Sequence, residues 1–150
     1  MKNVLVTGGS GYIGSHSLIQ LIEHGYSPIV LDNFCNSSIE AIKRVEKITS
    51  STVQYIEGDI RNFDCLSQIF ESFKFDSVIH FAGLKSVPES ISDPFSYYEN
   101  NVFGSLQLFK VMSIYNVRKI VFSSSATVYG IPLSLPLIES MPTGNPTNPY

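Results

Sequence analysis

The sequence predicts an α/β fold, a doubly wound parallel sheet with the strand order 3-2-1-4-5. Through residues 1–125, short β-branched runs alternate with longer segments of helical spacing, which is typical of βαβ units. The runs are apolar along most of their length, as expected of parallel strands that helices cover on both faces. A glycine-rich turn joins the first run to the first helical segment. One domain of this class accounts for the whole chain.

Five segments have the composition of buried strands, and four segments between them have helical spacing. The predicted strands are Asn3–Thr7, Pro28–Asp32, Val53–Glu57, Ser77–His80 and Lys119–Ser123. The predicted helices are Tyr12–His24, Ser38–Ile48, Asp64–Phe73 and Pro94–Tyr115. The last helix begins after Asp93, an N-cap residue followed by a proline at the first helical position, and it is the longest.

The first helical segment and the C-terminal segment each have a distinctive sequence pattern. The first helical segment places Ile13, Ser17, Leu21 and His24 near one face, and a glycine follows where a C-cap is expected. Residues 131–150 hold five of the eight prolines and a single charge, so we expect an ordered but irregular loop there.

Composition and charge exclude several classes of function. The chain has 10 Lys and Arg against 13 Asp and Glu and no basic cluster, which argues against a nucleic-acid partner. It has no apolar run long enough for a spanning helix or a signal peptide, so we expect a cytoplasmic protein without a membrane partner. Cys35 and Cys65 lack metal-site or disulfide spacing, and the three histidines are scattered. We therefore expect no metal.

The turn after the first strand is the strongest local signal. It reads Thr7-Gly8-Gly9-Ser10-Gly11-Tyr12-Ile13-Gly14, and a helix follows directly. Glycines at 8, 11 and 14 allow a tight turn, close approach of backbone N–H groups to a pyrophosphate, and close packing of helix on strand. The helix N-terminus adds partial positive charge. The pattern is that of a Rossmann dinucleotide turn, with the spacing GxxGxxG.

Acidic residues follow the next two strands. Asp32 ends the second predicted strand, where a carboxylate accepts the hydroxyls of an adenosine ribose and repels a 2′-phosphate. No arginine follows at positions 33–37, so NAD is favoured over NADP. Asp59 follows the third strand at the same sheet edge, where it is either a partner for the exocyclic amine of adenine or an ordinary turn residue.

Several segments together resemble the UDP-glucose 4-epimerase family of the extended short-chain dehydrogenase/reductases, and the resemblance covers the whole chain. The glycine turn continued by Ser15-His16, and Asp32-Asn33, are common to that superfamily. Two strings are more specific: His80-Phe81-Ala82-Gly83-Leu84-Lys85 and Ser123-Ser124-Ser125-Ala126-Thr127-Val128-Tyr129-Gly130. Asn148-Pro149-Tyr150 completes the match.

The resemblance implies an isomerase that interconverts UDP-galactose and UDP-glucose. In that family a tightly bound NAD takes a hydride from C4 of the hexose while a tyrosine takes the proton of the 4-hydroxyl. The resulting 4-keto sugar receives the hydride back on its other face. By position, Tyr150 is the acid/base group and Ser125 assists it, while Lys85 and Thr127 join them in binding the substrate.

The resemblance also implies which residues bind NAD. They come from the glycine turn, from the segments that follow the strands, and from the long helix. They are Gly8, Gly11, Tyr12, Ile13, Gly14, Asp32, Asn33, Phe34, Cys35, Asn36, Ser37, Asp59, Ile60, Phe81, Ala82, Gly83, Leu84, Lys85, Asn100, Ser123 and Tyr150. Pro88 stands where the family more often has glycine, so we expect the loop after Lys85 to be stiffer or differently shaped.

By the same resemblance, residues 1–150 form an incomplete NAD-binding domain that ends at the catalytic tyrosine. The family's final strands, a lysine one helical turn after the tyrosine, and the substrate domain would follow. We expect the 150-residue chain to be inactive by itself. We also expect residues 119–123 to form an exposed sheet edge that favours association. Complete family members are expected to be homodimers, with the long helix as a dimer face.

Three alternatives remain open from the sequence. Another nucleotide-sugar enzyme, such as a 4,6-dehydratase or a decarboxylase, would carry acidic residues in the region 125–127, which reads Ser-Ala-Thr here. A non-enzymatic nucleotide-sensing module would keep the glycine turn without the tyrosine–lysine pair. A purely structural Rossmann remnant would bind no dinucleotide.

Overall fold

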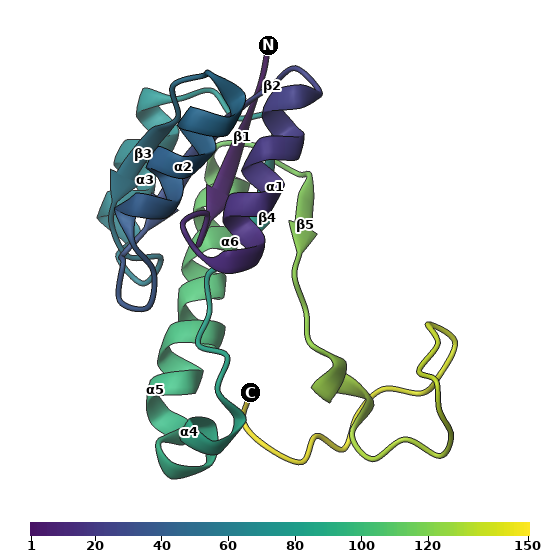
Figure 1. The fold of residues 1–150 in the computed structure, drawn as a ribbon. Helices are drawn as coiled ribbons and strands as arrows, with labels where there is room; N and C mark the ends of the chain where they lie inside the picture. The colour runs from purple at the N-terminus through teal and green to yellow at the C-terminus, as the bar shows by residue number, and fades with distance from the viewer.

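The protein is a five-stranded parallel sheet with helices on both faces. The computed structural model describes all residues, 1–150. The strands are β1 Lys2–Thr7, β2 Tyr26–Asp32, β3 Gln54–Glu57, β4 Ser77–His80 and β5 Ile120–Phe122. Their order is β3-β2-β1-β4-β5 and every pair is parallel (Figure 1). The predicted fold class and strand order are confirmed, and the predicted strand ends lie within two residues of the observed ones.

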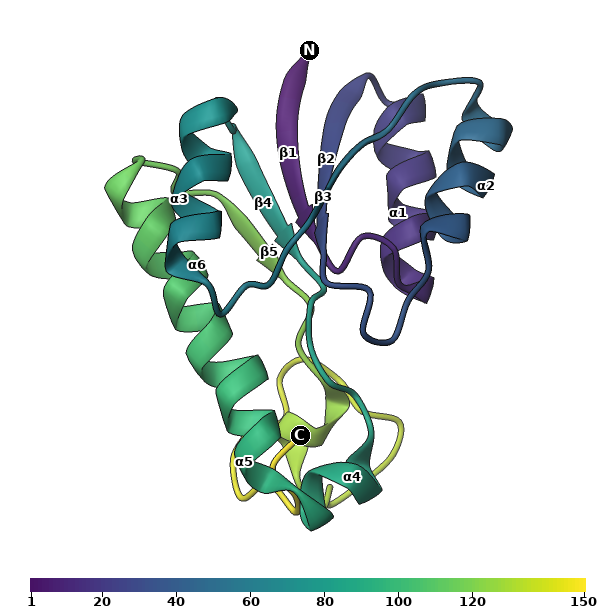
Figure 2. The ribbon, with the colours of Figure 1, turned by 90° about the vertical axis from the view of Figure 1, so that its left-hand side faces the viewer.

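Two helices cover each face of the sheet. The helices α1 (Tyr12–Glu23) and α2 (Ile39–Thr49) lie on one side, and α3 (Phe63–Ser72) and α6 (Gly104–Ile114) lie on the other (Figure 2). Side-chain caps start two of them. The Ser38 hydroxyl accepts a hydrogen bond from the Glu40 N–H, and the Asn62 side chain accepts one from the Cys65 N–H.

The core divides into two clusters, one on each face of the sheet. Because successive strand residues point to opposite faces, Val4 and Val6 pack under α1 and α2 while Leu5 packs under α3 and α6. This explains why the strand sequences are apolar throughout instead of alternating. On α1, the buried residues are Gly14 and Leu18.

The predicted face of α1 through Ile13 is therefore not the one packed on the sheet, and Ile13 is 58% exposed. The reason is the close approach at Gly14, which turns the Gly14–Leu18 side of the helix onto the strands. The adjacent Ile13 face stays at the surface.

The long fourth helix is continuous but has three parts. It comprises α5 (Pro94–Tyr97), a π-helical segment η1 (Tyr98–Phe103), and α6. The sequence predicts one uniform helix over this range. A π segment widens the helix and shifts the side chains that follow it, and such segments are frequent at functional sites.

A short helix, α4 (Val87–Ser92), was not predicted. Its N-cap is Ser86, whose hydroxyl accepts a hydrogen bond from the Glu89 N–H. Pro88 lies in its first turn, where a missing N–H costs nothing. The segment at Pro88 is therefore helical, and the expected stiffer or differently shaped loop after Lys85 stays a prediction. The Ser-x-x-Glu pattern of residues 86–89 is a capping box, which indicates the start of a helix in the sequence.

The chain leaves the sheet after β5. All three residues of β5 are exposed, and β5 forms the sheet edge, as expected. A 3₁₀ helix, η2 (Ala126–Tyr129), was not predicted, whereas residues 131–150 are irregular as expected. This segment runs away from the sheet and returns so that the C-terminus lies near α4 and α5 (Figures 1 and 2). Across the molecule, every helix is too short or too polar to cross a membrane.

Candidate functional site

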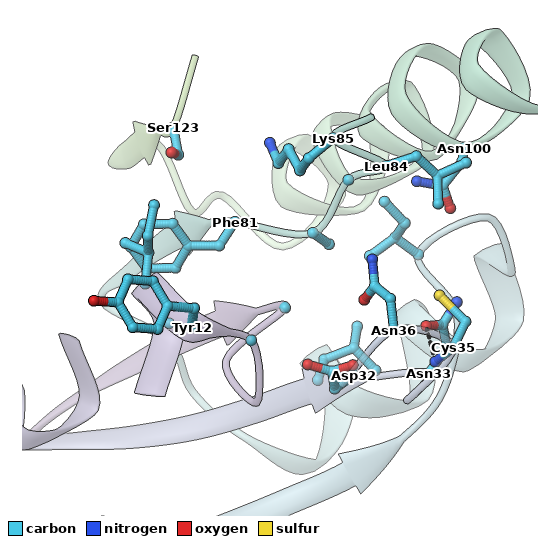
Figure 3. A pocket seen from close by; sticks show the side chains of 18 of the residues that line it. Tyr12, Asp32, Asn33, Cys35, Asn36, Phe81, Leu84, Lys85, Asn100 and Ser123 are labelled. Carbon is cyan, nitrogen blue, oxygen red and sulfur yellow. Dashed lines mark hydrogen bonds between the residues drawn. The ribbon is translucent and has the colours of Figure 1, made fainter. Parts of the chain in front are cut away.

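A pocket opens at the carboxyl ends of the strands, where ligands bind in doubly wound sheets. Its wall contains most of the predicted cofactor-binding residues: Gly8, Gly11, Tyr12, Ile13, Gly14, Asp32, Asn33, Cys35, Asn36, Ile60, Phe81, Ala82, Gly83, Leu84, Lys85, Asn100 and Ser123. Tyr12 and Phe81 lie together at one end, Asp32 lies at the base, and Asn33, Cys35 and Asn36 lie at the other end (Figure 3). Lys85 and Asn100 reach in from the opposite side.

The glycine turn has its shape because two of its glycines leave no room for a side chain. Gly8 has a φ of +67°, and a Cβ there would lie 2.6 Å from the backbone nitrogen of Ala82. A Cβ on Gly14 would lie 2.7 Å from the Cα of Gly9. The first contact brings the turn against the loop after β4, and the second brings α1 onto the turn. The predicted roles of these two glycines thus have a steric basis.

The start of α1 offers unpaired donors to the pocket. The backbone N–H groups of Tyr12, Ile13 and Gly14 make no hydrogen bond within the chain, and the N-cap residue Gly11 has no side chain to satisfy them. The hydroxyl of Ser10 is the only buried side-chain polar atom without a partner. Free N–H groups at a positive helix end and an unpaired buried hydroxyl fit an anionic ligand group such as a phosphate.

Asp32 connects the turn to the loop after β2. Its carboxylate accepts hydrogen bonds from the Ser10 N–H at 2.9 Å, the Phe34 N–H at 3.0 Å and the Ser37 hydroxyl at 2.9 Å. A carboxylate offers about four acceptor positions. One position remains for a ligand hydroxyl, and a second becomes free if the Ser37 hydroxyl turns away.

Asp59 does not line the pocket, although its neighbours Gly58 and Ile60 do. The Arg61 guanidinium donates to both carboxylate oxygens at 2.9 and 2.8 Å, and the Arg61 N–H and the Asn33 amide donate two more hydrogen bonds. These bonds, first of all those from the Arg61 side chain, lower the pKa of Asp59 to about 2. The expected contact of Asp59 with an adenine amine stays a prediction. Asp59 also holds Asn33, which lines the pocket.

The loop from Phe81 to Lys85 is fastened at two points. The Asn101 side chain accepts from the Leu84 N–H at 2.8 Å and donates to the Leu84 carbonyl at 2.9 Å. The Tyr97 hydroxyl accepts from the Ser86 N–H and donates to the Glu89 carboxylate, both at 2.8 Å. Burial, with Glu89 adding to it, raises the pKa of Tyr97. Lys85, between these two points, has its ammonium 5.7 Å from the centre of the Tyr150 ring.

The predicted catalytic residues form a second cluster beside Lys85 and outside the pocket wall. Thr127 Oγ1 lies 3.0 Å from Ser125 Oγ and donates to the Tyr150 carbonyl at 2.8 Å. The Asn148 side chain accepts a hydrogen bond from the Tyr150 N–H at 3.1 Å. The 3₁₀ helix and the end of the irregular segment are thereby joined, so Ser125, Thr127, Tyr150 and Lys85 come together from distant parts of the sequence.

Some predicted residues lie outside the pocket wall, and two residues in the wall were not predicted. Phe34, Ser37, Asp59 and Tyr150 were expected to contact a cofactor and do not line the pocket. Phe34 packs instead against the α1–α2 core cluster and lies edge-on to Tyr55. The unpredicted wall residues are Leu31, at a strand end, and Gly58, whose missing side chain makes room for Cys65. No group of three potential metal ligands is present.

His80 lies directly behind the pocket, at the end of β4, and is 2% exposed. Burial lowers the pKa of its imidazole to about 4, and the positive charge of Lys85 adds to this effect. An unfolded histidine titrates near 6.5. Between these two pH values the unfolded state binds more protons than the folded state, so stability rises with pH across that window and falls as the pH is lowered through it.

We therefore expect the free energy of unfolding to fall by roughly 2 to 3 kcal/mol between pH 7 and pH 4.5 because of His80. Urea unfolding at the two pH values measures this loss. His80→Gln should remove that part of the pH dependence. His24→Gln should leave it unchanged, because His24 is exposed at the C-cap of α1. The same pH dependence in the His80 variant and in the unmodified chain would contradict the assignment.

Comparison with known proteins places these features in a family. The family model for GDP-mannose 4,6 dehydratase matches residues 5–150. A UDP-glucose 4-epimerase of Neisseria meningitidis serogroup A is 52% identical over 150 residues, which is 100% of this chain and 44% of that protein. The human UDP-glucose 4-epimerase is 49% identical over 155 residues, covering 99% of this chain and 44% of that protein. The chain thus spans less than half the length of these relatives.

Solved structures agree with the sequence comparison. A UDP-glucose 4-epimerase from Bifidobacterium longum in complex with NAD⁺ and UDP matches with a TM-score of 0.97 and 51% identity, over 99% of this chain and 44% of that one. A UDP-glucose 4-epimerase from Stenotrophomonas maltophila with bound NAD and formylated UDP-arabinopyranose matches with a TM-score of 0.95 and 39% identity, over 100% of this chain and 44% of that one.

Proposed function

The chain belongs to the family that the GDP-mannose 4,6 dehydratase model describes, and from its similarity to UDP-glucose 4-epimerases we propose that it is the NAD-binding part of such an enzyme. The enzyme would interconvert UDP-galactose and UDP-glucose through a 4-keto sugar. The observation that carries the proposal is the convergence of the glycine turn, Asp32, Lys85 and Tyr150 at one end of the sheet. Residues 125–127 are Ser-Ala-Thr, without the acid expected of a dehydratase.

The residues of the pocket fit NAD in three places. The free N–H groups at the start of α1 suit its pyrophosphate, and the absence of side chains at Gly8 and Gly14 lets the backbone come close. Asp32 suits an adenosine ribose with free hydroxyls. Lys85 and Ser123 lie toward the opposite end of the pocket, where the nicotinamide half would be held (Figure 3). The chemistry that bound NAD would supply is to accept a hydride from the sugar and to return it within the same turnover.

The proton chemistry belongs to the cluster beside Lys85. Tyr150 takes the proton of the sugar 4-hydroxyl and gives it back, and the Ser125 hydroxyl binds the same oxygen. A phenol has an ordinary pKa of about 10, so its use as a base near neutral pH requires nearby positive charge. The ammonium of Lys85 lies 5.7 Å from the centre of the Tyr150 ring.

A homodimer in the cytoplasm, acting in galactose metabolism, is part of the proposal. The exposed apolar residues of the long helix support the dimer. They include Leu106, Phe109 and Ile114, and the Phe109 ring lies 6.3 Å from the ring of the exposed Phe122 of β5. An apolar surface of this kind is typical of a protein–protein interface.

Calorimetric titration of the purified chain with NAD⁺ and NADP⁺ tests the cofactor assignment. We expect NAD⁺ to bind, and NADP⁺ to bind at least about tenfold more weakly because its 2′-phosphate meets the Asp32 carboxylate. Asp32→Asn should narrow this difference by removing the negative charge. Thr49→Val, at the far end of α2, is the control and should leave both affinities unchanged. Failure of the unmodified chain to bind NAD⁺ would refute the proposed function.

A further inference from the structure

The buried side chain of His80 is held by hydroxyls on both sides. Its Nδ1 lies 2.6 Å from the Thr7 hydroxyl at the end of β1, and its Nε2 lies 2.9 Å from the Ser105 hydroxyl on α6. All three residues are buried. None of them lines the pocket, yet Thr7 directly precedes the glycine turn and His80 directly precedes the loop that begins at Phe81.

The neighbouring hydrogen bonds determine which group donates and which accepts in each of the two hydrogen bonds of His80. The Ser105 hydroxyl donates its single hydrogen to the Asn101 carbonyl at 2.5 Å, so it can only accept from the imidazole. Nε2 must therefore carry the hydrogen. Nδ1 is then the acceptor, and the Thr7 hydroxyl donates to it. Thr7 Oγ1 in turn accepts from the Ala82 N–H at 3.4 Å.

The chain of hydrogen bonds joins three parts of the pocket wall. It begins at Ala82, in the loop after β4, and passes Thr7, which positions the glycine turn. It ends at Asn101 in the π segment. The side chain of Asn101 holds both backbone groups of Leu84, and its neighbour Asn100 lines the pocket. The turn, the loop and the π segment are thereby held in one arrangement.

We propose that His80 is a positioning residue for the dinucleotide, acting as the neutral Nε2–H tautomer that fixes the glycine turn and the loop 81–85 relative to each other. The inference rests on the proposed function, because it takes NAD as the ligand of the pocket. A Cβ on Gly8 would lie 2.6 Å from the Ala82 nitrogen, so turn and loop are already in tight contact there. A small shift between them changes the surface on which the cofactor lies.

A protonated imidazole does not fit this arrangement. A hydrogen on Nδ1 would point at Thr7 Oγ1, and the Thr7 hydroxyl would lose the acceptor for its own hydrogen in a buried place. The charged group nearby is the ammonium of Lys85, which opposes a second positive charge. The structure therefore admits one tautomer and one protonation state at neutral pH.

Two-bond ¹H–¹⁵N correlation spectra of the unmodified chain at pH 7 test the tautomer directly and need no cofactor. We expect the His80 ring to give the pattern of the neutral Nε2–H form. The exposed residues His16, on α1, and His24, at the C-cap of α1, serve as internal references in the same spectra. A neutral Nδ1–H form or an imidazolium at pH 7 would overturn the inference.

Calorimetric titration with NAD⁺, together with the melting temperature, tests the positioning role. We expect Thr7→Val and Ser105→Ala to raise the Kd for NAD⁺ about tenfold, the equivalent of one buried hydrogen bond. Thr7→Ser keeps the hydroxyl and should restore the Kd to within about twofold. Thr49→Val removes a comparable hydroxyl, bonded to the Val45 carbonyl at 2.9 Å, and should lower the melting temperature without changing the Kd.

The outcomes separate the two proposals. If the unmodified chain does not bind NAD⁺, the proposed function fails and the positioning role fails with it. If it binds NAD⁺ and the Thr7→Val and Ser105→Ala variants bind equally well, only the positioning role is overturned. A loss of affinity in Thr7→Ser as large as in Thr7→Val would also overturn it, because the hydroxyl would then not be the cause.

Discussion

Replacing Tyr150 by phenylalanine is expected to lower the rate of UDP-galactose conversion by about 10²–10⁴-fold, the usual contribution of a general acid–base group. Phenylalanine keeps the ring, and with it the contact to the Lys85 ammonium, but cannot take or return a proton. The loss should appear in kcat more than in KM, because the missing step is chemical. The chain spans 44% of the relatives' length, so the assay uses the longest gene product that contains residues 1–150.

The matched control for this variant is Tyr129→Phe. Tyr129 lies in the same cluster of segments, at the end of the 3₁₀ helix, and its hydroxyl makes no hydrogen bond within the chain. Removing that hydroxyl should change kcat by less than about twofold. Equal losses in the two variants would mean that phenolic hydroxyls near the pocket matter only for packing or solubility. The assignment of Tyr150 as acid/base group would then be withdrawn.

The sequence predicted the sheet well because the physical demands on its strands are strong. Parallel strands buried on both faces must be apolar throughout, and the segments around Leu5, Ile29 and Val78 meet that demand. The short helix at Val87–Ser92 was missed because it is brief and contains a proline. The π segment was missed because its helical register depends on tertiary contacts, such as that of Asn101 with Leu84.

In the candidate site, backbone-driven features were predicted better than side-chain partnerships. The glycine turn and Asp32 could be recognised because phosphate and ribose recognition demand those residue types at those places. The pairing of Asp59 with the guanidinium of Arg61 was not predicted from the sequence. Tyr97 and Asn101 were missed because they act on the loop 81–86 from a helix that follows it in sequence.

The largest expected effect on stability comes from Gly8→Ala. We expect this change to lower the free energy of unfolding by about 4 kcal/mol or more, a large share of what a single domain has. A φ of +67° costs a side chain roughly 1 to 2 kcal/mol. The new Cβ would also lie 2.6 Å from the Ala82 nitrogen and 2.9 Å from the Phe81 carbonyl carbon, so the turn and the loop would have to separate.

Gly25→Ala separates backbone strain from overlap. Gly25 has a φ of +77°, similar to that of Gly8, but a Cβ there would have nothing within 4 Å. Its substitution should therefore cost only the strain, about 1 kcal/mol. Urea unfolding of the two variants measures the difference. Similar losses for both would show that the contact between turn and loop contributes nothing. A large loss at Gly8 alone would show that the arrangement of the pocket depends on a backbone approach that only glycine allows.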